Sequence, residues 1–479
     1  MTNSRLNAIR EDRLRKLEEL RQMGINPYPY KYDKTHTCQE ATDSLGKKVK
    51  SAGRIMAMRS HGAMTFVDLQ DQSGSIQVWF KEDDLADDYQ ILDLLDRGDF
   101  IGVEGEVVKT KTGEISIDVG SFKLLSKSLR PLPEKWHGLK DTEERYRKRY
   151  LDLIMNPDTR DLFVQKFKFW NTMRTFLIEK GFLEVHTPVL ETTTGGADAA
   201  PFVTHHNTLD IDVYLRISMG ELWQKRLMVG GFEKTFELGR QFRNEGMSTE
   251  HLQDYMQMEF YWAYANYEQG MELVKEMYRR VAKEVLGTQK FKTRGFEIDF
   301  SKEWEKIDYV QEVEKQTGVN YFQAGLKDIK AKLKELKVDY EEGPKERLMD
   351  LLWKQCRQNI VGPAFVINIP VEVSPLAKRS EEDPRLVERF FPIFAGSEIG
   401  NGYSELNDPV DQEERFKRQQ EMRDEGDEEA QMHDKEFVEA LEYGMPPTCG
   451  FGTSLRFFAY LVDRPIRECQ LFPLMKPKD

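Results

Sequence analysis

The 479-residue sequence is poor in cysteine and lacks the marks of several common protein classes. Its cysteines are widely scattered, without paired ligand spacing, so neither a zinc site nor a disulfide framework is predicted. No apolar run approaches the length of a membrane span. The polar start "MTNSRLNAIREDRLRK" lacks the apolar segment of a secretion signal. These absences predict a cytoplasmic protein without a membrane partner.

Two common functional motifs are also missing. The sequence has neither a GxxxxGK[ST] loop for nucleotide phosphates nor a paired histidine motif for a metal. The net charge of -13 argues against a surface that binds nucleic acid throughout, but it leaves room for a local basic strip. Residues 1–45 are expected to form a basic helical extension. "RLNAIREDRLRKLEELRQMG" predicts an amphipathic helix whose polar side is either a solvated surface or a contact for phosphate groups. Its apolar side would carry Leu6, Ile9, Leu14, Leu17 and Leu20.

Residues 46–128 contain short strands separated by Gly, Asp and Ser turns, which predicts a small closed barrel of the oligonucleotide-binding (OB) type. In "GSIQVWF", Ile76, Val78 and Phe80 would point inward and Gln77 outward. Phe66 and Gln77 could stack on and hydrogen-bond an unpaired base. Taken alone, they are better described as a core aromatic and a surface amide.

Composition changes in "LRPLPEKWHGLKDTEERYRKRYLDL", and residues 129–148 are expected to be a linker. Residues 149–479 then mix helices and strands without regular strand-helix-strand alternation. This pattern predicts an α+β multidomain protein whose second domain is an antiparallel sheet flanked by helices. A helical insertion at about 300–360 is expected to be a surface decoration. Its apolar stripe would carry Leu326, Ile329, Leu333 and Leu336.

Polar residues alternate with apolar ones in "QFRNEGMSTEHLQDYMQMEFYW" (241–262). Period two separates Met258 and Phe260 from the polar and aromatic face of the same strand. Two such strands would present charge and rings together, which suits a charged ligand carrying an aromatic base. The residues alone fit an ordinary hairpin with a solvated face equally well.

Two distant stretches add to this surface. In "GSEIGNGYSELND" (396–408), Asn401, Tyr403 and Glu405 would share one strand face, while Gly400 and Gly402 would let the backbone bend or approach a ligand. In "PPTCGFGTSLRFF" (446–458), glycines precede a predicted helix whose first turn carries an arginine. Backbone N–H groups and a guanidinium would meet an anion there.

Taken together, these stretches resemble the class II aminoacyl-tRNA synthetases. "FRNEG" with its following strand resembles motif 2, "GFGTSLR" resembles motif 3 and "GFLEVHTPVL" resembles motif 1. More narrowly, "RYRKRYLDL", "GGADAAPFVTHHN", "YLRISMGELWQKRL", "VEVSPLAKR", "EIGNGYSELND" and "LFPLMKP" resemble the lysine-tRNA ligases. The resemblance runs from about residue 5 to the C-terminus.

The resemblance implies an ATP-dependent ligase that activates L-lysine as lysyl-adenylate and transfers it to the 3′ end of tRNA(Lys). Arg243 matches the catalytic arginine on the α-phosphate, and Arg456 matches the one on the γ-phosphate. ATP would be bound by Arg243, Glu245, His251, Tyr255, Glu398 and Arg456. Lysine would be bound by Glu221, Glu259, Tyr261, Asn401, Tyr403 and Glu405.

The resemblance also implies a metal site, an anticodon site and a dimer. Glu398 would ligate Mg²⁺, and the barrel would bind the anticodon through Arg54, Phe66, Gln77 and Glu114. The family forms homodimers through motif 1, which places Gly181, Phe182 and Pro188 near the expected interface.

Three departures from the family pattern stand out. Phe391 replaces a second metal-binding glutamate, so Glu398 is the remaining matched carboxylate. The glycine run of motif 3 is one residue short, with Ser454 and Leu455 before its arginine. In motif 2, Glu250 stands where the family more often has arginine, which predicts weaker contact with the triphosphate.

Two alternatives are weighed against this reading. An aspartate or asparagine tRNA ligase shares the barrel and the core, but an acidic substrate would want a basic residue at Glu221 and Glu405. A non-catalytic tRNA-binding paralogue is suggested by Phe391 and the altered motif 3. The presence of Arg243 and Arg456 together argues against it.

Overall fold

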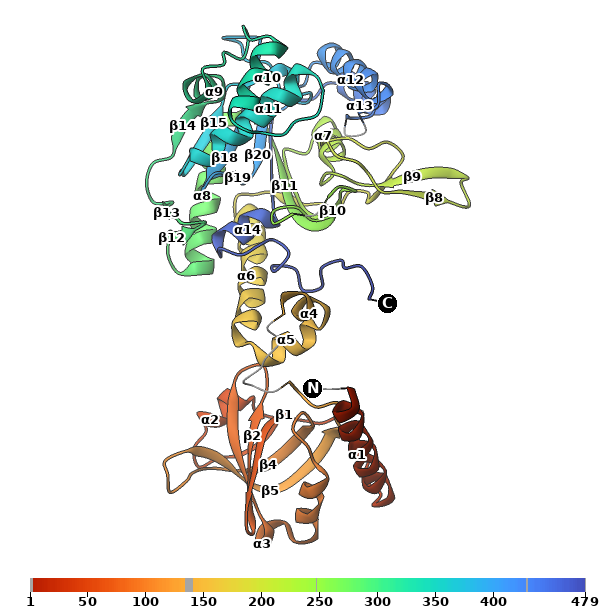
Figure 1. Cartoon of the computed structure of the whole chain (residues 1–479), viewed down its shortest axis with the longest axis vertical. Helices are drawn as coiled ribbons and strands as arrows, with labels where there is room; N and C mark the ends of the chain where they lie inside the picture. The colour runs from red at the N-terminus through yellow and green to blue at the C-terminus, as the bar shows by residue number, and fades with distance from the viewer. Residues whose placement is uncertain (1–2, 134–140, 247, 428–429, 479) are drawn as a thin grey trace. The chain divides into compact units, whose positions relative to one another are not determined.

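The computed structural model describes residues 3–133, 141–246, 248–427 and 430–478. The chain forms two units, Met1–Thr142 and Glu143–Asp479 (Figure 1). Part of the expected linker, residues 134–140, lies outside the described residues. The rest of that range is structured: Leu132 is buried in the first unit, and α4 (Thr142–Arg147) opens the second. Both ends of the range therefore belong to the units, because they carry residues that pack.

The first unit is built on a closed barrel with the strand order β1-β2-β3-β5-β4. The short strands expected between residues 46 and 128 are present, and their alternating apolar positions face the interior. Ile76, Val78 and Phe80 are buried and Gln77 is partly exposed, as predicted. The strands are β1 (Lys48–His61), β2 (Met64–Gln70), β3 (Ser75–Lys81), β4 (Phe100–Lys109) and β5 (Ile115–Ser126).

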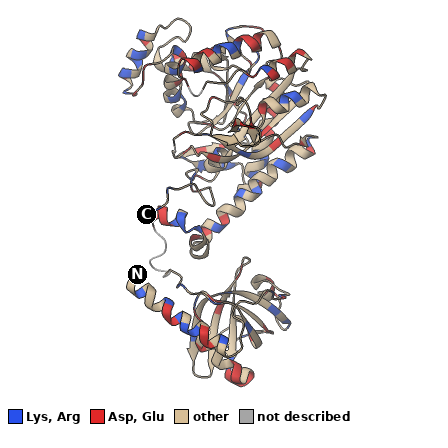
Figure 2. Cartoon of the chain, turned by 90° about the vertical axis from the view of Figure 1, so that its right-hand side faces the viewer, with Lys and Arg blue, Asp and Glu red and all other residues tan. Residues whose placement is uncertain are grey.

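The predicted N-terminal helix is α1 (Asn3–Gln22), and its apolar side packs as expected, with Leu17 and Leu20 buried. Arg13 is buried too, and its guanidinium donates to the carbonyls of Arg97 and Ser128. This basic residue therefore anchors the helix. The polar side carries both signs of charge (Figure 2). The remaining helices of the unit are α2 (Cys38–Thr42), α3 (Glu82–Leu85) and η1 (Ala86–Leu94).

The second unit is organised around a sheet that, within the described residues, has nine strands in the order β14-β15-β18-β20-β21-β11-β10-β6, with β19 beside β18. Most neighbours are antiparallel, as predicted, but β14–β15 and β6–β10 are parallel pairs near its ends. The strands are β6 (Leu183–Glu184), β10 (Lys234–Phe242), β11 (Asp254–Ala263), β14 (Glu305–Asp308), β15 (Ala364–Ile367), β18 (Arg389–Phe394), β19 (Ser397–Glu398), β20 (Asn401–Ser404) and β21 (Thr448–Ser454).

One face of this sheet is covered by α6 (Pro157–Glu179), α8 (Tyr267–Leu286) and α14 (Leu455–Leu461). Aromatic rings fill the space between, and Tyr278 stacks on Phe457 with 3.9 Å between ring centroids. Arg149, the first residue of α5 (Arg149–Met155), is fully buried and donates to Asp152 and to carbonyls of the C-terminal segment. These hydrogen bonds fix the C-terminal segment to α5.

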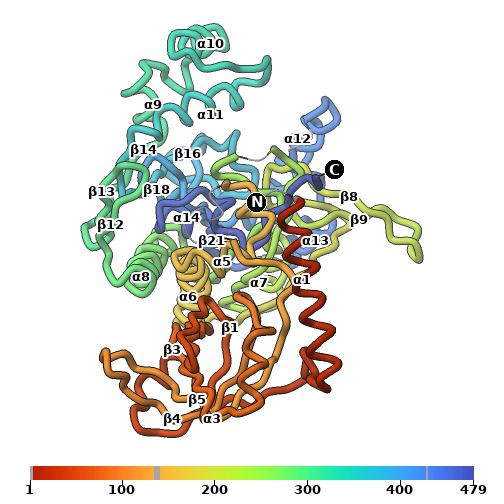
Figure 3. Tube along the Cα trace, turned by 60° about the horizontal axis from the view of Figure 1, so that its bottom comes forward, coloured from red at the N-terminus to blue at the C-terminus, as the bar shows by residue number. Residues whose placement is uncertain are grey.

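The predicted insertion forms α9 (Tyr309–Thr317), α10 (Leu326–Glu335) and α11 (Lys345–Cys356), which lie together in Figure 3. Ile329 and Leu333 are buried as expected. Leu326 and Leu336 are 42% and 40% exposed, so the predicted apolar stripe is wrong at both ends. The stripe needs a partner along its whole length, and α11 covers only its centre.

Short elements complete the second unit. They are α5 (Arg149–Met155), α7 (Glu221–Val229), α12 (Pro409–Asp424), α13 (Lys435–Glu442), β7 (Leu190–Glu191), β8 (Val203–His206), β9 (Ile211–Leu215), β12 (Lys290–Thr293), β13 (Phe296–Asp299), β16 (Ile369–Pro370), β17 (Leu386–Val387), η2 (Arg357–Asn359) and η3 (Val371–Val373). Among the described residues, no helix is both long and apolar enough to cross a bilayer.

Candidate active site

A cavity of about 330 Å³ lies on the sheet of the second unit, lined by strands β11, β18, β19, β20 and β21 and by α7. Residues singled out from distant parts of the sequence meet in its wall: Glu221, Arg243, Tyr255, Glu259, Tyr261, Glu398, Asn401, Tyr403, Glu405 and Arg456. Glu245 and His251 are outside this lining set. The ten predicted residues named above therefore lie in one cavity, together with others that the sequence did not single out.

Strand alternation places these side chains. On β11, Glu259 and Tyr261 face the cavity while Met258 and Phe260 join the aromatic core, as predicted. On β20, Asn401 and Tyr403 face the cavity. Successive residues of a strand point to opposite faces, so one sheet supplies both a core and a site.

The glycines of this region serve packing as well as the site. A Cβ on Gly402 would lie 2.6 Å from the Phe390 ring, on the core side. The expected ligand approach at Gly402 is therefore wrong, since its open side faces the aromatic core. A Cβ on Gly450 would lie 2.0 Å from Glu405 Oε1. Gly450 thus makes room for the Glu405 carboxylate.

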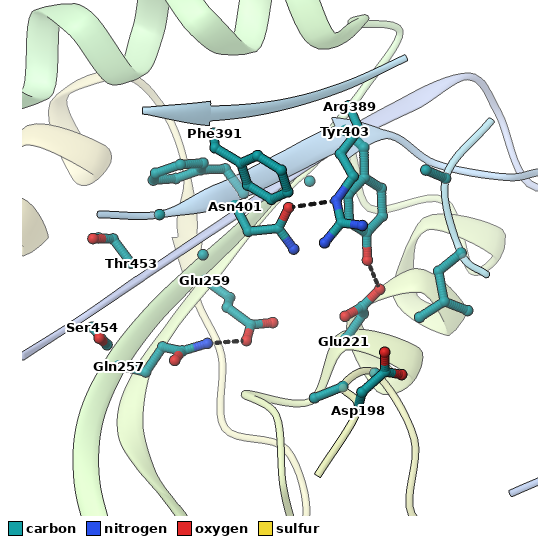
Figure 4. Close-up of a pocket in the computed structure, with 18 of the residues that line it drawn as sticks. Asp198, Glu221, Gln257, Glu259, Arg389, Phe391, Asn401, Tyr403, Thr453 and Ser454 are labelled. Carbon is teal, nitrogen blue, oxygen red and sulfur yellow. Dashed lines mark hydrogen bonds between the residues drawn. The ribbon is translucent and has the colours of Figure 1, made fainter. Parts of the chain in front are cut away.

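One end of the cavity gathers the buried carboxylates Glu221, Glu259 and Glu405, which are at most 5% exposed. The Tyr403 hydroxyl donates to Glu221, and Gln257 donates to Glu259 (Figure 4). Glu259 also accepts from the Met219 backbone N–H at 3.1 Å and from the Tyr261 hydroxyl at 3.0 Å. These hydrogen-bond donors are uncharged, so they do not neutralise the carboxylates. This end of the cavity therefore suits a cationic ligand.

Burial and neighbouring carboxylates make two of these acids, Glu259 and Glu405, reluctant to ionise. Burial, with the Glu221 charge next, raises the pKa of Glu259 to about 7. Burial also raises the pKa of Glu405 well above its ordinary value, although the Lys225 ammonium opposes this. A bound cation would reverse both effects by favouring the charged forms.

A buried ammonium group completes the cluster. Lys225 Nζ lies 2.8 Å from Glu221 Oε1 and 2.5 Å from Glu405 Oε2. Although burial opposes its charge, Glu221 and Glu405 raise the pKa of Lys225 above its ordinary value. The sequence interpretation missed Lys225; its spacing four residues after Glu221 in "ELWQK" is the signal that could have found it.

The other end of the cavity carries basic and aromatic groups. Arg243 and Arg456 line it with Tyr255, whose hydroxyl accepts from Gln241. Arg456 Nη2 lies 2.9 Å from His251 Nε2. Partial burial and the Arg456 charge lower the pKa of His251, so its neutral ring can accept this hydrogen bond.

Motif 3 is rebuilt around Ser454, which caps the seven-residue α14 and accepts the Arg456 backbone N–H at 3.3 Å. Backbone N–H groups here were expected to bind an anion. The Arg456 N–H already has Ser454 as its acceptor, so it does not play that part. The guanidinium of Arg456 still reaches the cavity.

Glu250 sits beside this arginine. Its Oε2 lies 4.0 Å from Arg456 Nε, and it accepts hydrogen bonds from Tyr460 and Ser397. Burial opposes its ionisation, but the Tyr460 hydroxyl and the Arg456 charge hold the pKa of Glu250 below its ordinary value. An ionised carboxylate therefore stands beside the proposed phosphate-binding guanidinium.

Glu398 also lines the cavity, and the Trp353 indole N–H of the insertion donates to its Oε1 at 2.5 Å. Phe391 faces the same cavity (Figure 4). No group of three or more His, Cys, Asp or Glu in the described part of the chain could hold a metal ion by itself. Mg²⁺ commonly binds through one or two carboxylates with phosphates and water, so Glu398 fits a metal carried mainly by a nucleotide.

Arg389 is a further cavity residue that the sequence interpretation missed. It donates to Asn401 at 2.9 Å and to the Val373 carbonyl at 2.7 Å (Figure 4). Asp198 and Gln257 also line the cavity without having been predicted. Gln257 had the required strand phase, and Asp198 lies within the stretch "GGADAAPFVTHHN"; Arg389 carried no local signal. The insertion was expected to be a surface decoration, and its Trp353 donates a hydrogen bond to Glu398 in the cavity wall.

In the barrel, the four residues expected to contact the anticodon lie on or beside its strands. Phe66 stacks on Trp79 with 5.7 Å between centroids. Gln77 accepts from the Ser116 hydroxyl, and Arg54 donates to the Gly98 carbonyl and covers the Phe100 ring. Glu114 is exposed just before β5.

The residues expected near a dimer interface divide into two groups. Gly181 and Pro188 are exposed. Phe182 is 4% exposed and packs on Phe260, so its side chain belongs to the core, and its place near an interface stays a prediction.

An antiparallel sheet that carries such a cavity, joined to a nucleic-acid-binding type of barrel, defines a class II tRNA synthetase. Residues 141–476 match the family "tRNA synthetases class II (D, K and N)", and residues 49–125 match "OB-fold nucleic acid binding domain". The chain is 48% identical to "Lysine--tRNA ligase" of Carboxydothermus hydrogenoformans, over 100% of both chains. It is 46% identical to the enzyme of that name from Thermotoga maritima, over 99% of this chain and 97% of the relative. The chain belongs to the lysine--tRNA ligase family of class II tRNA synthetases.

Proposed function

We propose that the chain activates L-lysine with ATP and transfers it to the 3′ end of tRNA(Lys). The observation that carries this proposal is the division of the cavity. Glu405 lies beside Gly450, which pairs with Tyr261 near one end of β11. Arg243 and Arg456 follow the pairs Phe242–Asp254 and Gln257–Ser454 toward the other end of β11. Lysine brings two ammonium groups, whereas ATP brings a chain of phosphates. The cavity is complementary in charge to both.

At the acidic end, Glu221 and Glu405 would hold the side-chain ammonium group, with Tyr403 packed along the aliphatic stem. Glu259, Tyr261 and Asn401 would contact the α-amino end. An acidic amino acid would face these carboxylates with like charge. A site that pairs a polar group can reject analogues that lack it by about 10⁴ to 10⁵.

At the basic end, Tyr255 would stack on adenine, Arg243 would hold the α-phosphate, and Arg456 the γ-phosphate. Glu245 and His251 would contribute from the motif 2 loop. The ionised lysine carboxylate attacks the α-phosphorus, the bond to pyrophosphate breaks, and no general base is needed. Arg243 would stabilise the charge that develops at this phosphoryl group.

Mg²⁺, when bound through Glu398 and the phosphates, would neutralise charge on the leaving pyrophosphate. Glu398 is already oriented by Trp353. With phenylalanine at position 391, the protein would offer fewer carboxylate oxygens than its relatives, so most ligands would come from ATP and water.

For transfer, the 3′ hydroxyl of tRNA attacks the lysyl carbonyl, forming the ester bond while AMP leaves. The barrel would bind the anticodon through Arg54, Phe66, Gln77 and Glu114. The Phe66–Trp79 stack offers a surface for a base. We further propose a cytoplasmic homodimer formed through motif 1, with Gly181 and Pro188 near the interface.

The test is amino-acid-dependent exchange of pyrophosphate into ATP, measured with lysine, with aspartate and without an amino acid. We expect a signal with lysine only, and its loss in Glu221→Gln and Glu405→Gln. The matched control is Glu276→Gln, because Glu276 pairs with Lys180 on the surface of α8. Normal exchange in both site variants would overturn the lysine assignment. Signal with aspartate would favour an aspartate ligase, and silence with every amino acid a non-catalytic tRNA-binding protein.

A further inference from the structure

The buried acids at one end of the cavity raise an electrostatic problem. Glu221, Glu259 and Glu405 lie together at 5%, 5% and 1% exposure. Like charges gathered out of water favour protonation of some of them, and a protonated acid binds an ammonium group weakly. The protein therefore needs a fixed positive charge to keep this end of the site ionised before substrate arrives.

Lys225 supplies that charge from behind the site. It lies one helical turn after Glu221 on α7, it is fully buried, and its ammonium contacts Glu221 and Glu405 together. The cavity is lined by both carboxylates but not by Lys225. Its ammonium packs near the rings of Tyr403 and Phe437, at 5.4 and 5.8 Å. Lys225 consequently leaves the substrate side of the carboxylates open.

We propose that Lys225 is a positioning and specificity-determining residue, a built-in counter-ion that opposes protonation of Glu405 and aims Glu221 and Glu405 at the substrate ammonium. This inference rests on the proposed function. When a bound cation favours the charged forms of all three carboxylates, the buried cluster of three carboxylates and one ammonium carries a net charge of -2. That charge balances the two ammonium groups of an amino acid with a basic side chain, while Arg243 takes the substrate carboxylate.

The neighbouring groups support this balance. The titratable groups that face the cluster from β11 and β20 are Glu259, Tyr261 and Tyr403, and Cys449 of β21 lies beside Glu405. The positive charge of Arg389 on β18 opposes the rise in the pKa of Tyr403. The Arg389 guanidinium, however, donates its hydrogen bonds to Asn401 and to the Val373 carbonyl. Among these groups, Lys225 is the cation bonded to the glutamates themselves.

The experiment measures the KM for lysine in pyrophosphate exchange from about pH 6 to about pH 9 in Lys225→Met. Methionine keeps much of the stem and removes the charge. We expect the KM for lysine to rise on the order of tenfold or more at neutral pH and to recover toward high pH, as the acids ionise without their counter-ion. The KM for ATP should change less than about twofold.

Lys275→Met is the matched control, because Lys275 is also mostly buried and pairs with two glutamates, Glu272 and Glu303, away from the cavity. It should leave the KM for lysine and its pH profile unchanged. A Lys225→Met enzyme with the normal KM for lysine, or with a KM raised equally at every pH, would show that the charge is not the reason for this residue.

A second variant keeps the test open if Lys225→Met does not fold. Lys225→Met/Glu405→Gln removes one charge of each sign and retains the net charge of the cluster. We expect it to be soluble and to show a raised KM for lysine that recovers less toward high pH than the KM of Lys225→Met does. Insolubility of both variants would assign Lys225 to packing. Absence of lysine-dependent exchange in the unaltered protein would instead refute the proposed function.

Discussion

Glu250 offers a direct test of how the arginine end of the cavity receives ATP. Its ionised carboxylate lies 4.0 Å from the Arg456 guanidinium that we assign to the γ-phosphate. The Tyr460 and Ser397 hydroxyl groups hold it there. ATP must therefore bring its terminal phosphate toward a site that already contains a negative charge. Glu250→Gln removes that charge and keeps one of the two oxygens, so that one of these hydroxyl groups retains its acceptor.

The size of the effect follows from the geometry. Two unit charges about 6 Å apart, across a guanidinium, interact by about 3 kcal/mol at an effective dielectric constant of about 20. The Glu250 side chain is 26% exposed, so solvent screening reduces the penalty to about 1 kcal/mol. This corresponds to an approximately fivefold lower KM for ATP in Glu250→Gln, since about 1.4 kcal/mol is tenfold.

The assay is pyrophosphate exchange at saturating lysine with ATP varied, at neutral pH. The KM for lysine should stay unchanged, because Glu250 lies at the phosphate end. Glu276→Gln, which makes the same charge change on the surface of α8, should behave like the unaltered enzyme. A KM for ATP that is unchanged or higher in Glu250→Gln would refute the reasoning, and would mean that Glu250 serves to orient Arg456.

Three further outcomes are expected. Trp353→Phe removes the hydrogen bond to Glu398 and should raise the magnesium concentration for half-maximal exchange several-fold, which corresponds to about 1 kcal/mol. The KM for lysine should stay unchanged. An unaltered magnesium dependence would argue against this role of Trp353. Arg149→Met leaves Asp152 buried without this partner and should lower the free energy of unfolding by about 3 to 5 kcal/mol, measured by denaturant titration; a change below about 1 kcal/mol would contradict it. Glu259 is protonated more readily in the fold than when unfolded, so its contribution to stability is present at low pH and is lost as pH rises through about 7. The increase in Tm caused by added lysine should therefore grow as pH rises through about 7. An increase that does not depend on pH would count against the assignment of Glu259 to lysine binding.

The sequence determined which residues of each strand face the core. Strict alternation made Gln257, Glu259 and Tyr261 one face of β11, and the same rule fixed the interior of the barrel. Strand position needs only local information, because neighbouring side chains point to opposite sides. The family motifs added the roles expected for the cavity residues.

Local patterns failed where a partner from another element decides the outcome. Leu326 and Leu336 satisfy the helical period but stay exposed, because they lie at the two ends of α10, whereas Ile329 and Leu333 between them are buried. Phe182 lies within motif 1, yet it packs into the core. Periodicity predicts that a face is apolar; it does not tell what covers that face.

Only the tertiary structure decided the electrostatics of the site. Lys225 meets Glu405 across 180 residues of chain, Glu250 meets Arg456, and Trp353 of the insertion meets Glu398. Charge interactions depend on distance and burial, and both arise only when separate elements pack. The sequence alone therefore determined the faces of the strands and the family, whereas folding decided which charges balance one another.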